Sequence, residues 1–458
     1  MRKYIGNRQF YKMVLAVAVP IMIQNGITNF VSLLDNIMVG QIGTVQMSGV
    51  AIANNLIFVY NICIFGAVSG AGIFGAQFYG NGSHDGVRHT LRFKLIICAI
   101  LFAAALLIFI FGGDALISLY LKGSGSAEDI SATFGYGRNY LDIMLIGFIP
   151  FTIAFVYAST LRECGETFVP MVAGVVAVVI NLVFNYILIF GHFGAPKMGV
   201  AGAAIATVIS RFVECLIVLI WTHRHTERNP FVVGLYKSLK IPGKLVLQII
   251  KKGSPLMINE ALWSAGMAIL LQCYSYRGLD VVAGQNISST VANVFNVVFL
   301  ALGNSVGIII GQLLGAGKME EAVDKNRKLI FFAVSVCFVI GTAMVFAAPV
   351  FPKLYNTTDS VRSLAASFII VEAVFMPVNS FIHASYFAMR SGGKTIITFL
   401  FDSVYVWVLS IPAAYLLSRY TGVTIVWLYV IVKSLDIVKC IIGYVLLKKR
   451  VWVNNIVV

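Results

Sequence analysis

Charged residues are scarce in this chain of 458 residues. Only 12% of the residues are charged and 59% are hydrophobic, whereas about a quarter of the residues in a typical soluble domain are charged. The mean hydropathy is +0.89. Because so many apolar residues must face lipid, the composition excludes an ordinary soluble protein and predicts an integral membrane protein.

Motifs typical of enzymes and metal proteins are also missing. The sequence has no GxxxxGKS/T loop, so ATP is not bound in that manner, and its histidines form no cluster with metal-ligand spacing. The seven cysteines form no CxxC pair, and we interpret them as small apolar side chains. We therefore predict no enzyme activity, no cofactor and no certain metal site, and we expect an ion gradient to supply the energy.

The net charge of +15 does not indicate nucleic-acid binding, because the basic residues lie in short connectors between apolar runs. They gather in alternate connectors, which include the N-terminal segment, 222–253 and 448–458. By the positive-inside rule, both termini and the middle segment are then cytoplasmic, and the protein spans the cell inner (plasma) membrane. Three other basic residues, Arg211, Lys433 and Lys439, fall inside apolar runs.

Twelve runs are long enough to cross a bilayer, for which a helix needs about 20 mainly apolar residues. Pro20 interrupts the first run, which then continues to full spanning length, so we interpret it as a retained helix and not as a signal peptide. The predicted spans are 14–38, 48–78, 93–112, 136–161, 169–190, 200–221, 254–274, 285–312, 329–348, 364–389, 396–417 and 423–447.

The two halves of the chain repeat each other. Matching positions include Pro20 with Pro255, Gln77 with Gln312, and LRECGET (161–167) with MRSGGKT (389–395). Six helices per repeat return the chain to its starting side, so the repeats share one orientation in the membrane. The predicted fold is an all-α integral membrane protein with twelve transmembrane helices in two pseudo-symmetric six-helix lobes around a central cleft. The lobes are 1–221 and 254–458, and 222–253 is a cytoplasmic linker.

Asp35 is the most informative acidic residue, because a carboxylate at membrane depth is costly and marks a functional site by default. Asp402, in FLFDSVYVW, is a second candidate, and Glu260 is a third because it occupies the repeat position of Asn25. For the other acids within spans we favour a structural role, near interfaces or paired with basic neighbours: Asp142, Glu214, Glu372 and Asp436.

Amide and hydroxyl side chains accompany these acids. Asn181 and Asn185 share one helix face at i, i+4 spacing, and their amides can coordinate a cation or clamp a carboxylate. Thr207 is a further hydroxyl candidate, although threonine in a membrane helix usually bonds to its own backbone. We also predict that polar side chains line the cleft and contact substrate: Thr28, Asn29, Asn54, Asn55, Gln285 and Asn286.

The order of these motifs resembles the multidrug and toxic compound extrusion (MATE) family over essentially the whole chain. The first helix resembles the family pattern in Pro20, Asp35 and Met38-Val39-Gly40. Further resemblance lies in Gln77 to Gly82, its repeat at Gln312 to Gly317, Leu161 to Thr167, and Gly199 to Thr207.

The resemblance implies export of drugs or metabolites coupled to H⁺ or Na⁺, with a first-lobe cation site at Asp35, Asn181, Asn185 and Thr207. Na⁺ is the metal ion that this site would hold. Family members often carry Asp where this chain has Asn185, and the family motif GGD appears here as Gly392-Gly393-Lys394. A second-lobe cation site of the NorM branch would rest on Glu260, with Asp402.

We expect a monomeric antiporter in the lipid bilayer that exports lipophilic organic cations by alternating access, with proton coupling favoured. A flippase for a lipid-linked precursor is an alternative, but it would need a basic cleft, and the first helix has no Lys or Arg after Lys12. A gated channel is an alternative from a different class, and transport stoichiometry would separate it from an antiporter.

Overall fold

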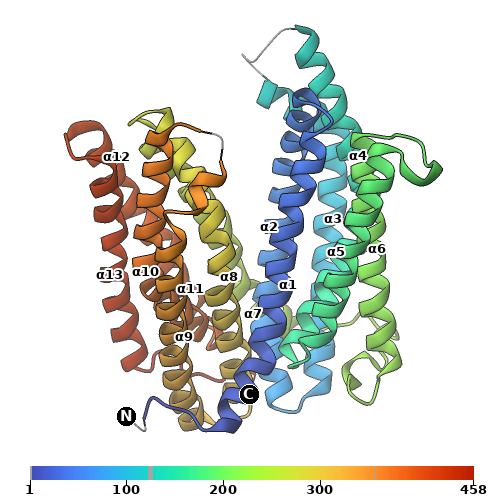
Figure 1. The fold of residues 1–458 in the computed structure, drawn as a ribbon. Helices are drawn as coiled ribbons and strands as arrows, with labels where there is room; N and C mark the ends of the chain where they lie inside the picture. The colour runs from blue at the N-terminus through green and yellow to red at the C-terminus, as the bar shows by residue number, and fades with distance from the viewer. Residues whose placement is uncertain (1–2, 122–126, 356, 458) are drawn as a thin grey trace. The chain divides into compact units, whose positions relative to one another are not determined.

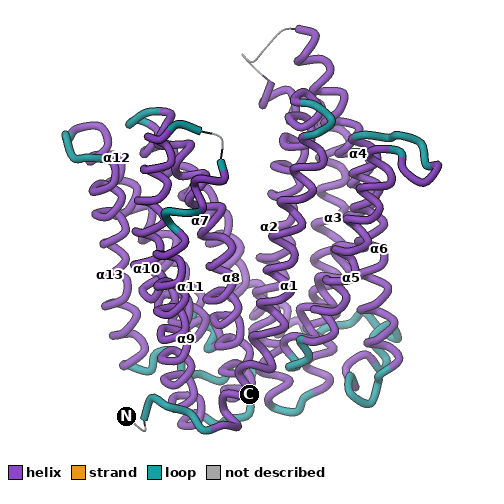
Figure 2. Tube along the Cα trace, viewed as in Figure 1, coloured by secondary structure: helices purple, strands orange, loops and turns teal. Residues whose placement is uncertain are grey.

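The structure, a computed structural model, describes residues 3–121, 127–355 and 357–457, without the side chains of residues 32, 33 and 36. Every regular element in these ranges is helical (Figures 1 and 2). The first half contains α1 (Arg8–Gly40), α2 (Thr44–Gly80), α3 (His84–Leu121), α4 (Ala127–Glu163), α5 (Phe168–Phe190), η1 (His192–Gly194), α6 (Val200–Arg224) and η2 (Pro230–Val232). The second half contains α7 (Gly243–Ser275), α8 (Leu279–Gly315), α9 (Met319–Ala347), η3 (Phe351–Leu354), α10 (Asp359–Ser391), α11 (Thr395–Phe399), η4 (Leu400–Val404), η5 (Val406–Ser410), α12 (Ile411–Tyr420) and α13 (Ile425–Lys448).

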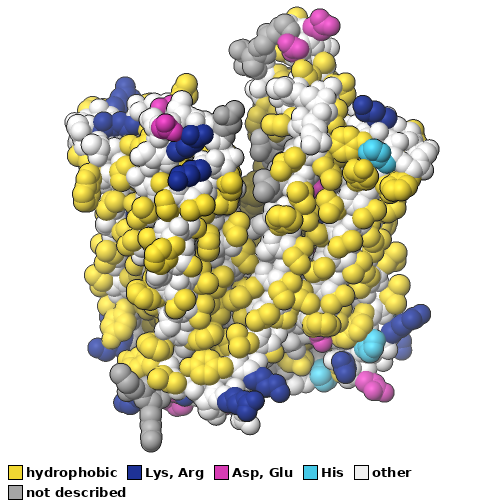
Figure 3. All heavy atoms as spheres, in the orientation of Figure 1, with side chains coloured by type: hydrophobic (Ala, Val, Ile, Leu, Met, Phe, Trp, Pro, Cys, Tyr) yellow, Lys and Arg dark blue, Asp and Glu magenta, His cyan; other side chains and the backbone are white. Residues whose placement is uncertain are grey.

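The helices confirm the predicted membrane spans. Eleven segments of the described chain are long and apolar enough to cross a membrane. The twelfth predicted span coincides with α13, which has 24 residues but carries Lys433, Asp436 and Lys439. Helices suit this setting because each backbone polar group finds its partner within the segment. In Figure 3, hydrophobic side chains cover the middle of the helices and most charged side chains lie toward their ends.

The chain divides into two compact units. The N-terminal unit contains residues 23–75 and 84–247, and the C-terminal unit contains residues 1–22, 76–83 and 248–458. Corresponding helices pack in the same way: α4 contacts α3 and α6 in the first unit, and α10 contacts α9 and α13 in the second. Prolines also recur inside matching helices, at Pro20, Pro150, Pro255 and Pro377.

One close contact within the C-terminal unit is reciprocal. A Cβ atom added at Gly80 would collide with the backbone of Gln312, and one added at Gly315 would collide with the backbone of Gln77. Only glycine allows the two helix ends to approach so closely. The segments from Gln77 to Gly80 and from Gln312 to Gly315 therefore make equivalent contacts with each other, which supports the predicted repeat.

The segment predicted as a linker lies mainly against the N-terminal unit. Arg92 on α3 donates from Nε to the carbonyl of Leu235 at 2.9 Å and from Nη2 to that of Gly234 at 2.8 Å. Arg88, one turn earlier, donates to the carbonyl of Phe231 at 3.1 Å. Residues up to 247 belong to this unit, so 222–253 is held along most of its length. The division into two lobes and a linker stays a prediction.

Candidate functional site

Asp35 lies on α1, half-buried in the N-terminal unit, and amide groups surround its carboxylate. Asn185 Nδ2 donates to Asp35 Oδ1 at 2.7 Å and to Asn181 Oδ1 at 3.2 Å. Both asparagines are buried on one face of α5, as their spacing predicts. The structure thus brings Asp35 and the predicted amide pair into one cluster.

Thr207 on α6 completes this cluster. Its hydroxyl donates to the carbonyl of Ala203 at 3.0 Å, and it lies 3.2 Å from the Asn181 amide. The backbone bond is the one expected of a membrane threonine, but the same hydroxyl also reaches the asparagine. We refer to Asp35, Asn181, Asn185 and Thr207 as the Asp35 cluster.

The Asn181 amide can satisfy this cluster in two orientations. With its nitrogen toward Asp35, it donates to the carboxylate at 3.0 Å, and its oxygen accepts at 3.2 Å from the Thr207 hydroxyl, which then no longer donates to Ala203. With its oxygen toward Asp35, its nitrogen donates to Thr207 at 3.2 Å. The first orientation suits a charged carboxylate, and the second suits a protonated carboxyl group that donates to the amide oxygen.

Two neighbours of Asp35 were not predicted. Tyr140 on α4 is buried beside the cluster and interacts with Asp35, Asn54 and Thr207. Arg211 on α6 acts electrostatically on Asp35 and pairs with Glu214 at 3.2 Å. Nothing in the sequence distinguishes Tyr140 from the other tyrosines. Arg211 could have been recognised, because a basic residue inside a predicted span indicates a nearby acidic partner.

Asp402 lies in the C-terminal unit and has a charged partner. Lys439 Nζ on α13 lies 2.7 Å from Asp402 Oδ1, and the lysine side chain is only 6% exposed. Asn259 on α7 donates to Asp402 Oδ2 at 3.2 Å. Asp402 falls in a π-helical turn, η4, and such turns occur frequently at functional sites. Lys439 was not predicted as its partner.

Glu260 lies one residue after Asn259 and close enough to Asp402 for the two acids to interact. Arg390 on α10 is the opposite charge that acts on Glu260. The structure therefore brings Glu260 and Asp402 together within one unit, as a second group of predicted residues. Whether either group couples ion movement to transport stays a prediction.

A second lysine–carboxylate pair lies in the same unit. Lys433 Nζ on α13 lies 2.7 Å from Glu372 Oε1 on α10. The Tyr429 hydroxyl donates to Glu372 and accepts from Gln285 Nε2 at 3.2 Å. Glu372 thus pairs with a basic residue, as predicted, and so do Asp142 with Arg138 and Glu214 with Arg211, each at 3.2 Å.

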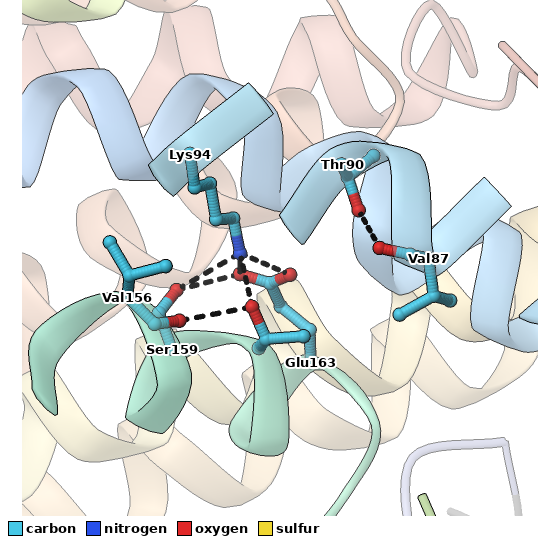
Figure 4. A network of polar contacts seen from close by, with 7 residues as sticks. Val87, Thr90, Lys94, Val156, Ser159 and Glu163 are labelled. Carbon is cyan, nitrogen blue, oxygen red and sulfur yellow. Dashed lines mark hydrogen bonds and ion pairs between the residues drawn. The ribbon is translucent and has the colours of Figure 1, made fainter. Parts of the chain in front are cut away.

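The N-terminal unit contains a buried ion pair of its own, at the end of α4 (Figure 4). Lys94 Nζ lies 2.6 and 2.7 Å from the two oxygens of Glu163 and 3.1 Å from Thr160 Oγ1, and its side chain is 0% exposed. Lys94 lies at the start of the predicted span 93–112, but the helix begins earlier than predicted, because α3 starts at His84. The first turns of α3 contain charged residues, so the apolar run from which the span was predicted begins later than the helix.

The residues predicted to contact substrate differ in exposure. Gln285 is half-buried beside Tyr429, and Asn54 interacts with Tyr140. The exposed members of the set are Thr28, Asn29, Asn54, Asn55 and Asn286. Four of the six belong to the N-terminal unit, and Gln285 and Asn286 belong to the C-terminal unit.

A metal centre is not evident in the described chain, where no three His, Cys, Asp or Glu side chains form a metal-binding group. Only Asp35 contributes a carboxylate to the Asp35 cluster. The remaining groups are amides and a hydroxyl, which suit a proton or a monovalent cation better than a divalent metal ion.

Comparison with known proteins places these features in one family. The sequence model of the family described as MatE matches residues 20–187 and 255–416, so its two matched segments begin at Pro20 and Pro255. The probable multidrug resistance protein NorM of Thermotoga maritima is 27% identical over 421 residues, covering 89% of this chain and 86% of the relative. The multidrug resistance protein MdtK of Pectobacterium atrosepticum is 24% identical over 406 residues, covering 88% and 86%.

The fold has close counterparts among solved structures. A crystal structure of the Vibrio cholerae MATE transporter VcmN matches with a TM-score of 0.86 at 17% identity and covers 96% of this chain and 97% of that one. At this identity the likeness establishes the fold. The family match over both halves establishes more: the chain belongs to the MATE family of multi-pass membrane transporters and is not an enzyme.

Proposed function

We propose that this protein is a secondary active antiporter that exports lipophilic organic cations in exchange for H⁺, by alternating access of two lobes. Two relatives that match most of the chain are named multidrug resistance proteins, which supports a small-molecule substrate. The distribution of basic residues supports the cell inner (plasma) membrane as the location, with both termini in the cytoplasm. We propose a monomer as the working unit.

The observation that carries this proposal is the arrangement around Asp35. Its hydrogen-bond partners are neutral amides that either donate or accept, so one geometry accommodates both protonation states. With the carboxylate charged, Asn181 donates to it and accepts from the Thr207 hydroxyl, which turns away from the Ala203 carbonyl. With the carboxyl group protonated, its O–H donates across the same 3.0 Å separation, and the Asn181–Thr207 bond reverses direction.

Coupling follows when proton and cargo prefer different conformations. A ligand shifts a conformational equilibrium only by its differential affinity for the two states. Protonation of Asp35 from outside then favours the state that releases substrate, and loss of the proton inside restores the state that accepts cargo. The two events compete for one carboxylate or for one conformation.

Na⁺ is the second candidate for the coupling ion, because one observation favours it. Asn185 Oδ1 is buried and has no hydrogen-bond partner among the described residues. The Asn185 nitrogen faces Asp35 and Asn181 in this structure. Rotation of the amide would bring Oδ1 to the oxygens of Asp35, Asn181 and Thr207, as a set of oxygen ligands with a single carboxylate. Hard cations are bound by such oxygen atoms.

Transport in proteoliposomes tests the proposal. We expect efflux of the lipophilic cation ethidium under an imposed pH gradient and little efflux under an imposed Na⁺ gradient. The reverse dependence would assign the coupling to Na⁺. Efflux that ignores both gradients, or many ions conducted per substrate, would overturn the antiport mechanism.

A further inference from the structure

A cavity of about 310 Å³ lies in the C-terminal unit, among α7, α8, α10, α13 and the π-helical turns η4 and η5. Its size falls at the lower end of the range for small-molecule sites, and such sites combine apolar walls with a few polar groups. The walls here include the aromatic side chains of Trp263, Tyr274, Phe299 and Tyr429. The charged residues of the lining are Glu372, Asp402, Lys433, Asp436 and Lys439.

These charges do not balance. Lys433 pairs with Glu372 and Lys439 pairs with Asp402, each at 2.7 Å. Asp436 lies between the two lysines on α13, three residues from each. Among the described residues it forms no ion pair or hydrogen bond, although both lysines act on it electrostatically. With histidine counted as neutral, the lining is left with one negative charge, which is costly at membrane depth.

The one side-chain atom of the lining that is fully buried without a hydrogen-bond partner in the described chain is an acceptor. Gln285 uses its Nε2 on Tyr429, and its Oε1 is buried without a partner in the described chain. The Asp436 carboxylate accepts hydrogen bonds and, when charged, donates none. The lining amides of Asn293, Asn296 and Asn379 can donate as well as accept. A ligand that completes Gln285 Oε1 and neutralises Asp436 must therefore donate hydrogen bonds and carry one positive charge.

The lysines are poorly placed to attract an anion instead. Lys433 Nζ lies over the Tyr429 ring at 5.5 Å, and Lys439 Nζ lies over the Phe401 ring at 5.3 Å. Each ammonium group thus contacts a carboxylate and an aromatic face. A bound anion would also raise the net charge of the cavity to two negative charges, whereas a monovalent cation brings it to zero.

We propose that this cavity binds a small organic ammonium ion, whose N–H groups donate to Asp436 and to Gln285 Oε1 while its apolar part contacts Trp263 and Tyr274. Aromatic faces attract cations, so the aromatic walls can contact both the ammonium group and the apolar part of such a ligand. The proposal rests on the proposed export of organic cations and adds to it a site, a size and a counter-ion. It also replaces the structural role that the sequence suggested for Asp436.

The test uses the purified full-length protein in detergent at neutral pH, without any gradient. Isothermal titration calorimetry measures binding of benzylammonium, with benzyl alcohol as the neutral analogue, benzoate as the anionic analogue, and NaCl. We expect saturable binding of benzylammonium only. Equal binding of benzyl alcohol or benzoate, or displacement of benzylammonium by Na⁺ at matched ionic strength, would overturn the proposal.

Variants locate the bound cation. We expect Asp436→Asn to weaken benzylammonium binding roughly tenfold or more, equivalent to about 1.4 kcal/mol, while the control Asp142→Asn binds as the parent does. If Asp436→Asn does not fold, Met267→Trp narrows the cavity without changing its charge and should also abolish binding. Unchanged binding in Met267→Trp, or in a folded Asp436→Asn, would place the ligand elsewhere and refute the site.

The same measurements separate this proposal from the proposed function. A protein that pumps ethidium but does not bind benzylammonium refutes the site alone. A protein that binds benzylammonium through Asp436 but shows no gradient-driven efflux keeps the site and refutes the antiport mechanism.

Discussion

Asp35 in the N-terminal unit and Asp402 in the C-terminal unit have different kinds of partner. Amides and a hydroxyl surround Asp35, and the opposite charge that acts on it, Arg211, forms its ion pair with Glu214. Asp402 is in direct contact with the ammonium group of Lys439. The first carboxylate can exchange a proton without breaking an ion pair, whereas the second is already neutralised by a cation that belongs to the protein.

This difference suggests a division of work between the two repeats. The Lys439 ammonium group occupies the position at Asp402 that a free cation would take. Asp402 is therefore expected to bind an external ion weakly. Among the residues that the structure describes, no lysine forms an ion pair with Asp35. We therefore assign ion coupling to Asp35, as a proposal, and stabilisation of the C-terminal unit to the pair formed by Asp402 and Lys439.

The largest effect is expected for Asp35→Asn. The substitution keeps the shape of the side chain and removes its titration, so the protein should fold and insert normally but lose gradient-driven efflux. Ethidium efflux from proteoliposomes should fall to the rate of protein-free liposomes. Asp142→Asn serves as the control because Asp142 pairs with Arg138 on its own helix. Near-normal pumping by Asp35→Asn would move the coupling site to Glu260 or Asp402.

The next effect concerns Lys439→Met, which leaves Asp402 buried beside Asn259 without its counter-ion. Removal of one partner of a buried pair costs about 3–5 kcal/mol, so thermal unfolding in detergent should shift strongly downward. The double variant Asp402→Asn with Lys439→Met should recover much of the loss.

The pair of Lys94 and Glu163 offers a matched control in the other unit. Lys94→Met should destabilise the protein similarly, because this pair is also buried. Asp35→Asn, in contrast, should leave the unfolding temperature almost unchanged. If Lys439→Met unfolds at the parent temperature and loses coupling instead, the proposed division of work between the two carboxylates is wrong.

A third change, Asn185→Asp, would make the first site resemble relatives with two acids. The new carboxylate would lie within hydrogen-bonding distance of Asp35. One added negative charge at about 4 Å strengthens the electrostatic binding of a cation by about 1–4 kcal/mol. We expect ethidium efflux driven by a Na⁺ gradient to appear or increase in this variant. Asn181→Asp, on the same helix face, is the companion variant. No response to Na⁺ in either variant would show that the charge of this cluster does not select the coupling ion.

Much of this arrangement could be predicted because it depends on local spacing. Apolar runs predict the spans, and the repeated motifs predict matching helices. Asn181 and Asn185 share a face by helical geometry alone. Grouping them with Asp35 needed more than spacing: it rested on their place in the same predicted lobe and on the resemblance to the MATE family.

The rest depends on tertiary packing that spacing does not reveal. On α13, the three-residue intervals suggest that Asp436 pairs with Lys433 and Lys439. In the structure these lysines reach Glu372 on α10 and Asp402 on η4 instead. Partners on other helices compete with neighbours on the same helix, and only the packed bundle decides between them. For this reason neither the Lys439 partner of Asp402 nor the cavity could be predicted.

The smallest effect is expected at Lys394, which matches Glu166 in the first repeat. Glu166 Oε1 accepts from the backbone nitrogens of Phe168 at 3.1 Å and Val169 at 3.3 Å, so it caps the start of α5. Lys394 immediately precedes α11 and provides no side-chain cap, and Lys252 donates to the neighbouring carbonyl of Gly393 at 2.9 Å.

Lys394→Ala should therefore leave ethidium efflux largely intact, because this lysine neither caps the helix nor contacts either group of coupling candidates. Lys394→Asp should do more, since an acidic residue accepts from the free N–H groups of the first turn and suits the helix dipole. We expect the free energy of unfolding to increase by about 0.5–1 kcal/mol, measured as a small rise in the unfolding temperature, and efflux to stay unchanged. A loss of efflux in Lys394→Ala comparable to that in Asp35→Asn would show that this lysine takes part in transport. Both repeats would then contribute a charge to the mechanism, and the contrast between Asp35 and Asp402 would no longer describe how the units differ.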